Sequence, residues 1–148
     1  MKLIYKDKEK DIAIYHLSEE LRERYANSYE AKPDIKINIG EKVFWFGDPN
    51  GLFVEKGEFT YKEGRIICRG KPGSDYERFY FVDNEIIQGD SGSPVFKEST
   101  GEIVGILANI FPNDIRLMKK YGLPPNKNYG LFIPITTFYS ALQEHNKN

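Results

Sequence analysis

The chain has 148 residues, of which 40% are hydrophobic and 14% aromatic, and 21 basic against 22 acidic residues give a net charge of −1. This size predicts one folding unit with a core of its own, and the balanced charges exclude a basic nucleic-acid surface and an anionic-membrane surface. A single cysteine, Cys68, excludes an internal disulfide, and no cluster has metal-ligand spacing, so we expect no metal and no cofactor.

The first residues predict two strands and a short helix. Leu3–Tyr5 and Ile12–Tyr15 are apolar stretches on either side of the charged turn Lys6–Lys10, which is the pattern of two strands. Ser18 is a good N-cap and acidic residues follow it, so a helix is predicted that ends before Pro33. No apolar run of signal-peptide length is present, which predicts a cytoplasmic location.

The central part of the chain predicts many short strands. Asp34–Ile39 alternates with period two, and Val43–Phe46 is a more fully apolar strand. Glu63-Gly64 is expected to form a turn between two further strands. Strands at about ten-residue spacing with Gly and Pro turns indicate an all-β barrel or sandwich. The remaining central strands are predicted at Val54–Tyr61, Arg65–Arg69 and Phe79–Val82.

The last third predicts a strand and two helices. Asn113–Tyr121 has one apolar face, a possible cap at Asn113 and a stop at Gly122, which predicts a short inserted helix. Thr136 or Thr137 is expected to cap a final helix that packs through its apolar face. A strand is expected at residues 95–96, directly after Pro94.

One stretch carries the chemistry: residues 88–96, Gln-Gly-Asp-Ser-Gly-Ser-Pro-Val-Phe. It places Ser91 between glycines where a strand should begin. A serine hydroxyl is a poor nucleophile unless a base takes its proton and backbone donors bind the oxyanion that forms. Gly89 lets the chain turn tightly enough for its own N–H and that of Ser91 to form an oxyanion hole. An ordinary turn is the alternative, because these residue types are also common turn formers.

The Gly-Asp-Ser-Gly-Ser-Pro run resembles the nucleophile loop of trypsin-like (chymotrypsin-fold) serine proteases, and most of all their high-temperature-requirement (Deg) branch. Asp11–Ile14 resembles that family's Asp-Leu-Ala-Val, which carries the triad aspartate. Residues 40–52 resemble its Gly-Asp-x-Val-x-Ala-Ile-Gly-x-Pro-x-Gly-Leu hairpin, which opens the second barrel. Three more stretches match the family. They are Asp83, before the nucleophile loop, and residues 101–106 and 130–135, which resemble the two strands that follow that loop.

The resemblance implies an all-β fold with a trypsin-like antiparallel barrel, and an endopeptidase that hydrolyses peptide bonds in peptide or protein substrates. Ser91 would be the nucleophile, Asp11 the triad aspartate, and the N–H groups of Gly89 and Ser91 the oxyanion hole. Asp90 would turn inward to a buried partner and hold the loop in shape. The implied walls of the substrate pocket are Glu85, Ile86 and Ile87, then Leu107, Ala108 and Asn109, and then Gly130 and Leu131.

One part of the pattern is missing, namely the histidine that a serine triad needs as its base. In the family it lies well before the aspartate, and here only ten residues precede Asp11. His16 follows Asp11 on the same predicted strand and His145 lies near the C-terminus, so we expect neither to serve. Residues 1–33 are therefore interpreted as a remnant of a first barrel with its connector, and residues 34–148 as a complete six-stranded barrel with a terminal helix.

Three hypotheses follow for function. The first is a serine endopeptidase given as an N-terminally truncated chain, inactive by itself. The second is a protease-like module that binds peptides without catalysis, and the third is a β-barrel unrelated to proteases. A histidine encoded upstream of Met1 would favour the first hypothesis. The incomplete first barrel leaves unpaired edges, so self-association through it is a further expectation, whereas nucleic acid and membrane are not expected partners.

Overall fold

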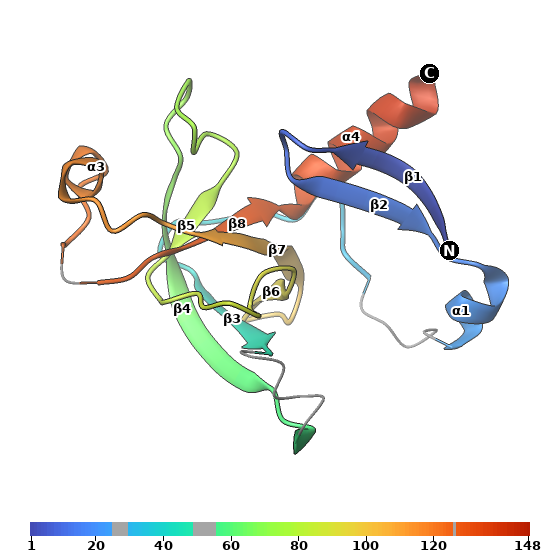
Figure 1. Ribbon diagram of the computed structural model, residues 1–148, viewed down its shortest axis with the longest axis horizontal. Coiled ribbons are helices and arrows are strands. Elements are labelled where there is room, and N and C mark those ends of the chain that lie inside the picture. The colour runs from blue at the N-terminus through green and yellow to red at the C-terminus, as the bar shows by residue number, and fades with distance from the viewer. Residues whose placement is uncertain (25–29, 49–55, 126) are drawn as a thin grey trace.

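The computed structural model describes residues 1–24, 30–48, 56–125 and 127–148. A two-stranded hairpin and a short helix form the N-terminal part, and a closed barrel with two helices forms the rest (Figure 1). The predicted all-β class with an antiparallel barrel and a short C-terminal helix is confirmed. Within the described residues, no helix combines the length and the apolar character needed to cross a membrane.

The N-terminal hairpin consists of β1 (Lys2–Asp7) and β2 (Ile12–His16), paired antiparallel as predicted. Its turn is built on Asp7, whose Oδ1 accepts the N–H groups of Glu9 and Lys10 at 2.9 and 3.0 Å. Ile12 is the one buried residue of the two strands. Helix α1 (Glu19–Arg24) follows, and the predicted continuation toward Pro33 includes residues 25–29, which lie outside the described ranges.

The barrel closes through antiparallel pairs in the order β3-β4-β5-β8-β7-β6. Closure is made by β3 and β6, where Val43 faces Lys97 and Phe44 faces Phe96. Every barrel strand therefore has two neighbours and no edge is left unpaired. The six strands are β3 (Lys42–Gly47), β4 (Thr60–Arg69), β5 (Tyr80–Val82), β6 (Pro94–Lys97), β7 (Ile103–Ile110) and β8 (Gly130–Pro134).

Strand β8 separates two apolar clusters, because its successive side chains point to opposite faces and all are buried. Phe132 packs with Trp45 and Val95 in one cluster. Leu131 and Ile133 belong to the other, which also holds Ile12 of the hairpin, Met118 of α3 and Ala141 of α4. The second cluster thus attaches the helices and the hairpin to the barrel.

Two strand predictions are wrong. Residues 34–39 form no strand, because the closed barrel offers no free edge, and Ile35 and Ile37 pack on the barrel core without a ladder. Glu63-Gly64 is not a turn, since β4 continues through it with Gly64 opposite Val43. The strand predicted at Val54–Tyr61 is present only at its end, where Thr60 and Tyr61 begin β4, and residues 56–59 form no strand. Residues 54 and 55, and the end of the matched hairpin at Gly51-Leu52, lie outside the described residues.

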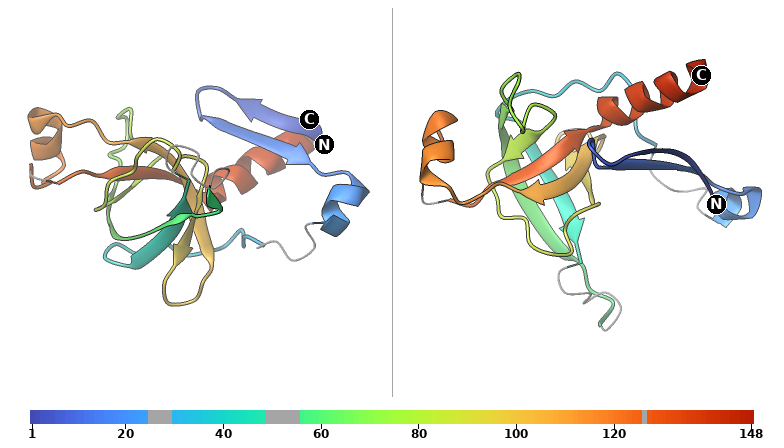
Figure 2. Two further views of the ribbon diagram at one scale, coloured as in Figure 1. Left: turned by 60° about the horizontal axis from the view of Figure 1, so that its bottom comes forward. Right: turned by 45° about the horizontal axis from the view of Figure 1, so that its top comes forward.

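The two later helices differ in their starts from the prediction. Helix α3 (Ile115–Lys120) is capped by Asp114, not Asn113, because the Asp114 carboxylate accepts the N–H groups of Arg116 and Leu117. Helix α4 (Ile135–Lys147) begins directly after β8 with Pro134 at its N-cap position, so no threonine caps it. It runs from the barrel along the β1–β2 hairpin and contacts both strands (Figure 2). The division into residues 1–33 and 34–148 stays a prediction.

Candidate active site

The serine loop lies between β5 and β6 and is shaped by two glycines. Gly89 and Gly92 have φ angles of 101° and 87°, a region that L side chains rarely adopt. The loop is fixed to β7, because the Gly92 N–H donates to the Leu107 carbonyl at 2.7 Å. Ser91 is exposed, and its hydroxyl donates to the carbonyl of Ala108 at 3.3 Å. The serine is thus held at the surface on a constrained turn.

Two backbone N–H groups of the serine loop donate no hydrogen bond to the other described residues. The N–H of Asp90 donates to the Ile87 carbonyl at 3.0 Å. Among the hydrogen bonds between described residues, none uses the N–H of Gly89 or that of Ser91. These are the two donors that the sequence assigned to an oxyanion hole, and their role stays a prediction.

Asp11 and Ser91 line the same cavity, of about 340 Å³. Asp11 sits at the end of the hairpin turn with a φ of 53°, the one positive φ outside glycine among the described residues. Neither His16 nor His145 belongs to the lining. The other lining residues come from β2, the serine loop, β7, β8 and α4: Ile12, Ala13, Gly92, Ile106, Leu107, Ala108, Ile133 and Phe138. The fold therefore brings the predicted nucleophile and the predicted aspartate to one hollow.

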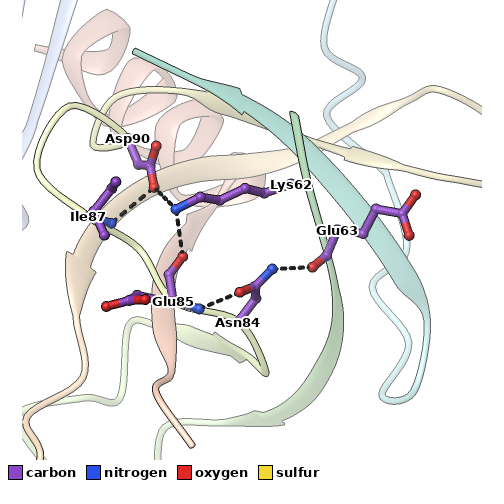
Figure 3. A network of polar contacts seen from close by, with 6 residues as sticks. All are labelled: Lys62, Glu63, Asn84, Glu85, Ile87 and Asp90. Carbon is purple, nitrogen blue, oxygen red and sulfur yellow. Dashed lines mark hydrogen bonds and ion pairs between the residues drawn. The ribbon is translucent and has the colours of Figure 1, made fainter. Parts of the chain in front are cut away.

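Asp90 is fully buried and turns inward, as predicted. Its Oδ2 accepts the ammonium of Lys62 at 2.8 Å and the N–H of Ile87 at 3.0 Å (Figure 3). The same ammonium donates to the Glu85 carbonyl at 3.1 Å. The partner of Asp90 is thus Lys62 on β4, which the sequence analysis missed. No local pattern indicates it, because the two residues are 28 positions apart.

The residues predicted as pocket walls fall into three groups. Leu107 and Ala108 line the cavity beside Ser91. Ile86 is buried in the barrel core and packs on Gly130, where an added Cβ would lie 2.2 Å from its Cδ1. Glu85 and Asn109 have exposed side chains, Ile87 is half-buried and Leu131 is buried. Which of them contact a substrate stays a prediction.

The other groups that could carry chemistry are metal-ligating side chains and the single cysteine. No three His, Cys, Asp or Glu side chains within the described residues gather closely enough to hold a metal ion. Cys68 is half-buried beside the second cluster, and burial raises the pKa of its thiol to about 11. A thiol so rarely ionised is a poor nucleophile, and Cys68 therefore acts as a small apolar side chain that packs beside the cluster.

Comparison with known proteins places this site in a family. The family described as "Trypsin-like peptidase domain" matches residues 1–106, which include Asp11 and Ser91. The chain belongs to this family. The match includes the hairpin and the serine loop, so it covers both parts of the site.

Among curated proteins, the chain is similar to probable periplasmic serine endoproteases described as DegP-like. It is 32% identical over 112 residues to one from Rhizobium meliloti, a match that covers 74% of this chain and 20% of the relative. It is 31% identical over 112 residues to one from Hahella chejuensis, with 22% of that relative covered. The chain thus spans about a fifth of these relatives. Because they are described as periplasmic, the predicted cytoplasmic location is wrong. The prediction relied on the absence of a long apolar run after Met1, which is no evidence of location.

Solved structures show the same fold. A serine endoprotease from Yersinia pestis aligns with 99% of this chain and 44% of its own, with a TM-score of 0.65 and 21% identity. The inactive form of the Rv3671c protease aligns with 75% of this chain and 52% of its own, with a TM-score of 0.51 and 20% identity.

Proposed function

We propose that this chain carries the nucleophile, the oxyanion hole and the triad aspartate of a trypsin-like serine endopeptidase that hydrolyses peptide bonds in peptide or protein substrates. The observation that carries the proposal is the shared cavity of Ser91 and Asp11. Ser91 attacks the scissile carbonyl, and the free N–H groups of Gly89 and Ser91 bind the negative oxygen of the tetrahedral intermediate. Asp11 orients the base, which lies between Asp11 and Ser91.

The base is a histidine that the two histidines of this chain do not supply, since neither lines the cavity. Loss of the histidine from such a unit lowers turnover by on the order of 10⁶, because serine and base act together. We therefore propose that these 148 residues alone cleave peptides at no useful rate. The cavity is the place that the imidazole of another segment would enter.

Chemical rescue tests this function. Ser91 labelling by a fluorophosphonate probe is followed with increasing imidazole, which should occupy the cavity and act as the base. We expect slow labelling without imidazole, an increase that saturates with its concentration, and none for Ser91→Ala. The matched control is 1-methylimidazole, which has no N–H for Asp11 to accept. Asp11→Asn should reduce rescue by imidazole and leave rescue by 1-methylimidazole unchanged.

Two outcomes contradict parts of the proposal. Rapid labelling without imidazole shows that a base is already present and removes the claim of inactivity. Absence of labelling at every imidazole concentration, with the fold intact by circular dichroism, removes Ser91 as a nucleophile.

The second candidate function is a peptide-binding module without catalysis. The lack of a histidine in the cavity lining favours it. A fluorescent extended peptide should then bind equally to the wild type and to Ser91→Ala and be recovered intact. Its cleavage in the presence of imidazole would favour the endopeptidase.

We further propose that the hairpin region associates with a second copy of the chain. Leu3 and Tyr15 of the hairpin are 46% and 48% exposed. Tyr15 also lines an apolar groove of about 470 Å³ between β2, β7 and α4. Exposed apolar surface of this kind marks interaction sites. Sedimentation should show a dimer that Tyr15→Glu dissociates, and a monomer at every concentration contradicts the proposal.

A further inference from the structure

The Lys62 ammonium joins two points of the loop that leads to the serine. It bonds the Asp90 carboxylate at 2.8 Å and the Glu85 carbonyl at 3.1 Å (Figure 3). Lys62 is the third residue of β4 and lies opposite Trp45, so its backbone is held in the barrel wall. The loop from Glu85 to Asp90 is therefore fastened to the barrel by one side chain.

The ion pair joins a buried carboxylate to a largely buried ammonium. The side chain of Asp90 has no exposed surface, and that of Lys62 is 15% exposed. A buried ion pair is costly to form and is often no more stabilising than apolar residues of the same size, whereas removal of one partner is strongly destabilising. Stability alone is thus a poor reason for the pair, and a role in fixing one loop conformation is the better one.

A glycine in the barrel wall, Gly47, provides the space that the Asp90 carboxylate occupies. Gly47, the last residue of β3, lies against Asp90, and a Cβ there would stand 1.7 Å from Asp90 Oδ1. The next residue, Asp48, donates its N–H to the Gly89 carbonyl at 3.3 Å. Two strands, β3 and β4, therefore hold the Asp90 side chain and the peptide before it.

We propose that Lys62 is a positioning residue for the oxyanion hole, a role that rests on the proposed function of Ser91. Asp90 stands between the two residues whose N–H groups would bind the oxyanion, Gly89 and Ser91. When Lys62 and Ile87 hold its side chain inside, the peptides on either side are fixed in one orientation. Release of the side chain would let both peptides rotate and remove donors from the hollow.

The test compares Lys62→Met with Lys97→Met. Lys97 is also a buried lysine in the barrel and pairs with Glu41 at 3.3 Å, but it lies on β6 away from the serine loop. It is the matched control for the loss of a buried ion pair. Amide NMR shifts report the loop, and imidazole-rescued fluorophosphonate labelling reports the chemistry.

For Lys62→Met we expect shifted amide signals at residues 89–91 and a maximal labelling rate reduced by about 100-fold, as for loss of an oxyanion donor, with the probe concentration for half-saturation unchanged. Lys62→Arg should recover most of that rate, and Lys97→Met should change neither readout. If Lys62→Met does not fold, the double variant Lys62→Met, Asp90→Asn leaves no buried lone charge and carries the same expectation.

Two results overturn the proposal: unchanged signals at residues 89–91 in a folded Lys62 variant, or equal changes in Lys97→Met. If the wild type is not labelled even with imidazole, the proposed function fails, and the NMR comparison still decides whether Lys62 positions the loop.

Discussion

The barrel and the N-terminal hairpin contribute one predicted triad residue each to the same cavity, but they are built very differently. Each barrel strand pairs with two neighbours, and Trp45, Phe81 and Phe132 are fully buried. The hairpin has two strands that pair with each other, and it buries Ile12 alone. The proposed nucleophile therefore lies on the more extensively buried region and the proposed triad aspartate on the less buried one. The distance between them depends on how the hairpin docks.

Docking of the hairpin rests on few contacts. Ile12 enters the cluster that holds Phe81 and Ala141, and both strands contact α4. An ion pair of 3.8 Å between Lys10 and Glu144 adds little, because both groups are largely exposed. An additional partner along the apolar groove would therefore order the hairpin and fix Asp11 beside Ser91.

The largest expected difference between the two regions is in core stability. Phe132→Ala removes a fully buried ring from the barrel and should lower the free energy of unfolding by about 3–5 kcal/mol. Leu3→Ala removes a side chain of the hairpin that is 46% exposed and should cost about 0.5 kcal/mol or less. Urea denaturation followed by Trp45 fluorescence measures both. Equal losses would mean that the hairpin is as well packed as the barrel.

Hydrogen exchange should separate the regions without any mutation. Amides in the barrel strands are expected to exchange through global unfolding, whereas those from Leu3 to Leu17 open locally. We expect the hairpin amides to exchange on the order of 100-fold faster in a dilute monomer. Protection of residues 3–17 equal to that of the barrel contradicts the comparison. Protection that appears only at high protein concentration supports association through the hairpin.

Sequence patterns were sufficient where the physics is local. Two strands around a charged turn, and a serine between glycines before a strand, are determined by residues next to one another, and both were found. Alternation at residues 34–39 predicted a strand wrongly, because pairing depends on a free edge that the closed barrel does not offer. Gly64 was taken for a turn because its place opposite Val43 is set by another strand.

The same limit applies to the candidate site, because sequence motifs do not show contacts between residues far apart in the chain. Ser91 and Asp11 were predicted from motifs, whereas the lysine that holds Asp90 is the third residue of β4 and belongs to no motif. Nothing in the sequence around Lys62 distinguishes it from the other lysines of a charged chain. Ile86 was placed in the pocket wall from its position in the loop, and its burial against Gly130 depends on the pairing of β5 with β8.

The reactivity of the Cys68 thiol at alkaline pH measures how often the barrel opens around it. Burial raises the pKa of Cys68 from 9.0 to about 11, so the folded state favours the neutral thiol. The stability that this contributes is complete below pH 9.0 and is lost as pH rises toward 11. At pH 9 we expect iodoacetamide to modify Cys68 at least about tenfold more slowly in the folded protein than in urea. Equal modification rates in the folded protein and in urea would show that β4 opens around Cys68 as readily as the hairpin opens.

The smallest expected effect is at the hairpin turn in acid. Hydrogen bonds from the backbone, that of Lys10 foremost, hold the pKa of Asp7 below its usual 3.8. Asp7 therefore stabilises the turn above pH 3.8, and this contribution is lost as pH falls through the lower value of the folded state. In an NMR titration the amides of Glu9 and Lys10 should shift in this range.

Asp7→Asn is the control for that titration, because its side-chain oxygen still accepts the turn hydrogen bonds but does not ionise. Its amides at Glu9 and Lys10 should not shift with the same transition. In the barrel, Glu102 also has a lowered pKa through its hydrogen bond from Lys32, so signals next to Glu102 are left out of the comparison. If the other barrel amides shift together with the hairpin turn, the two regions unfold as one unit, and the aspartate is held as firmly as the serine.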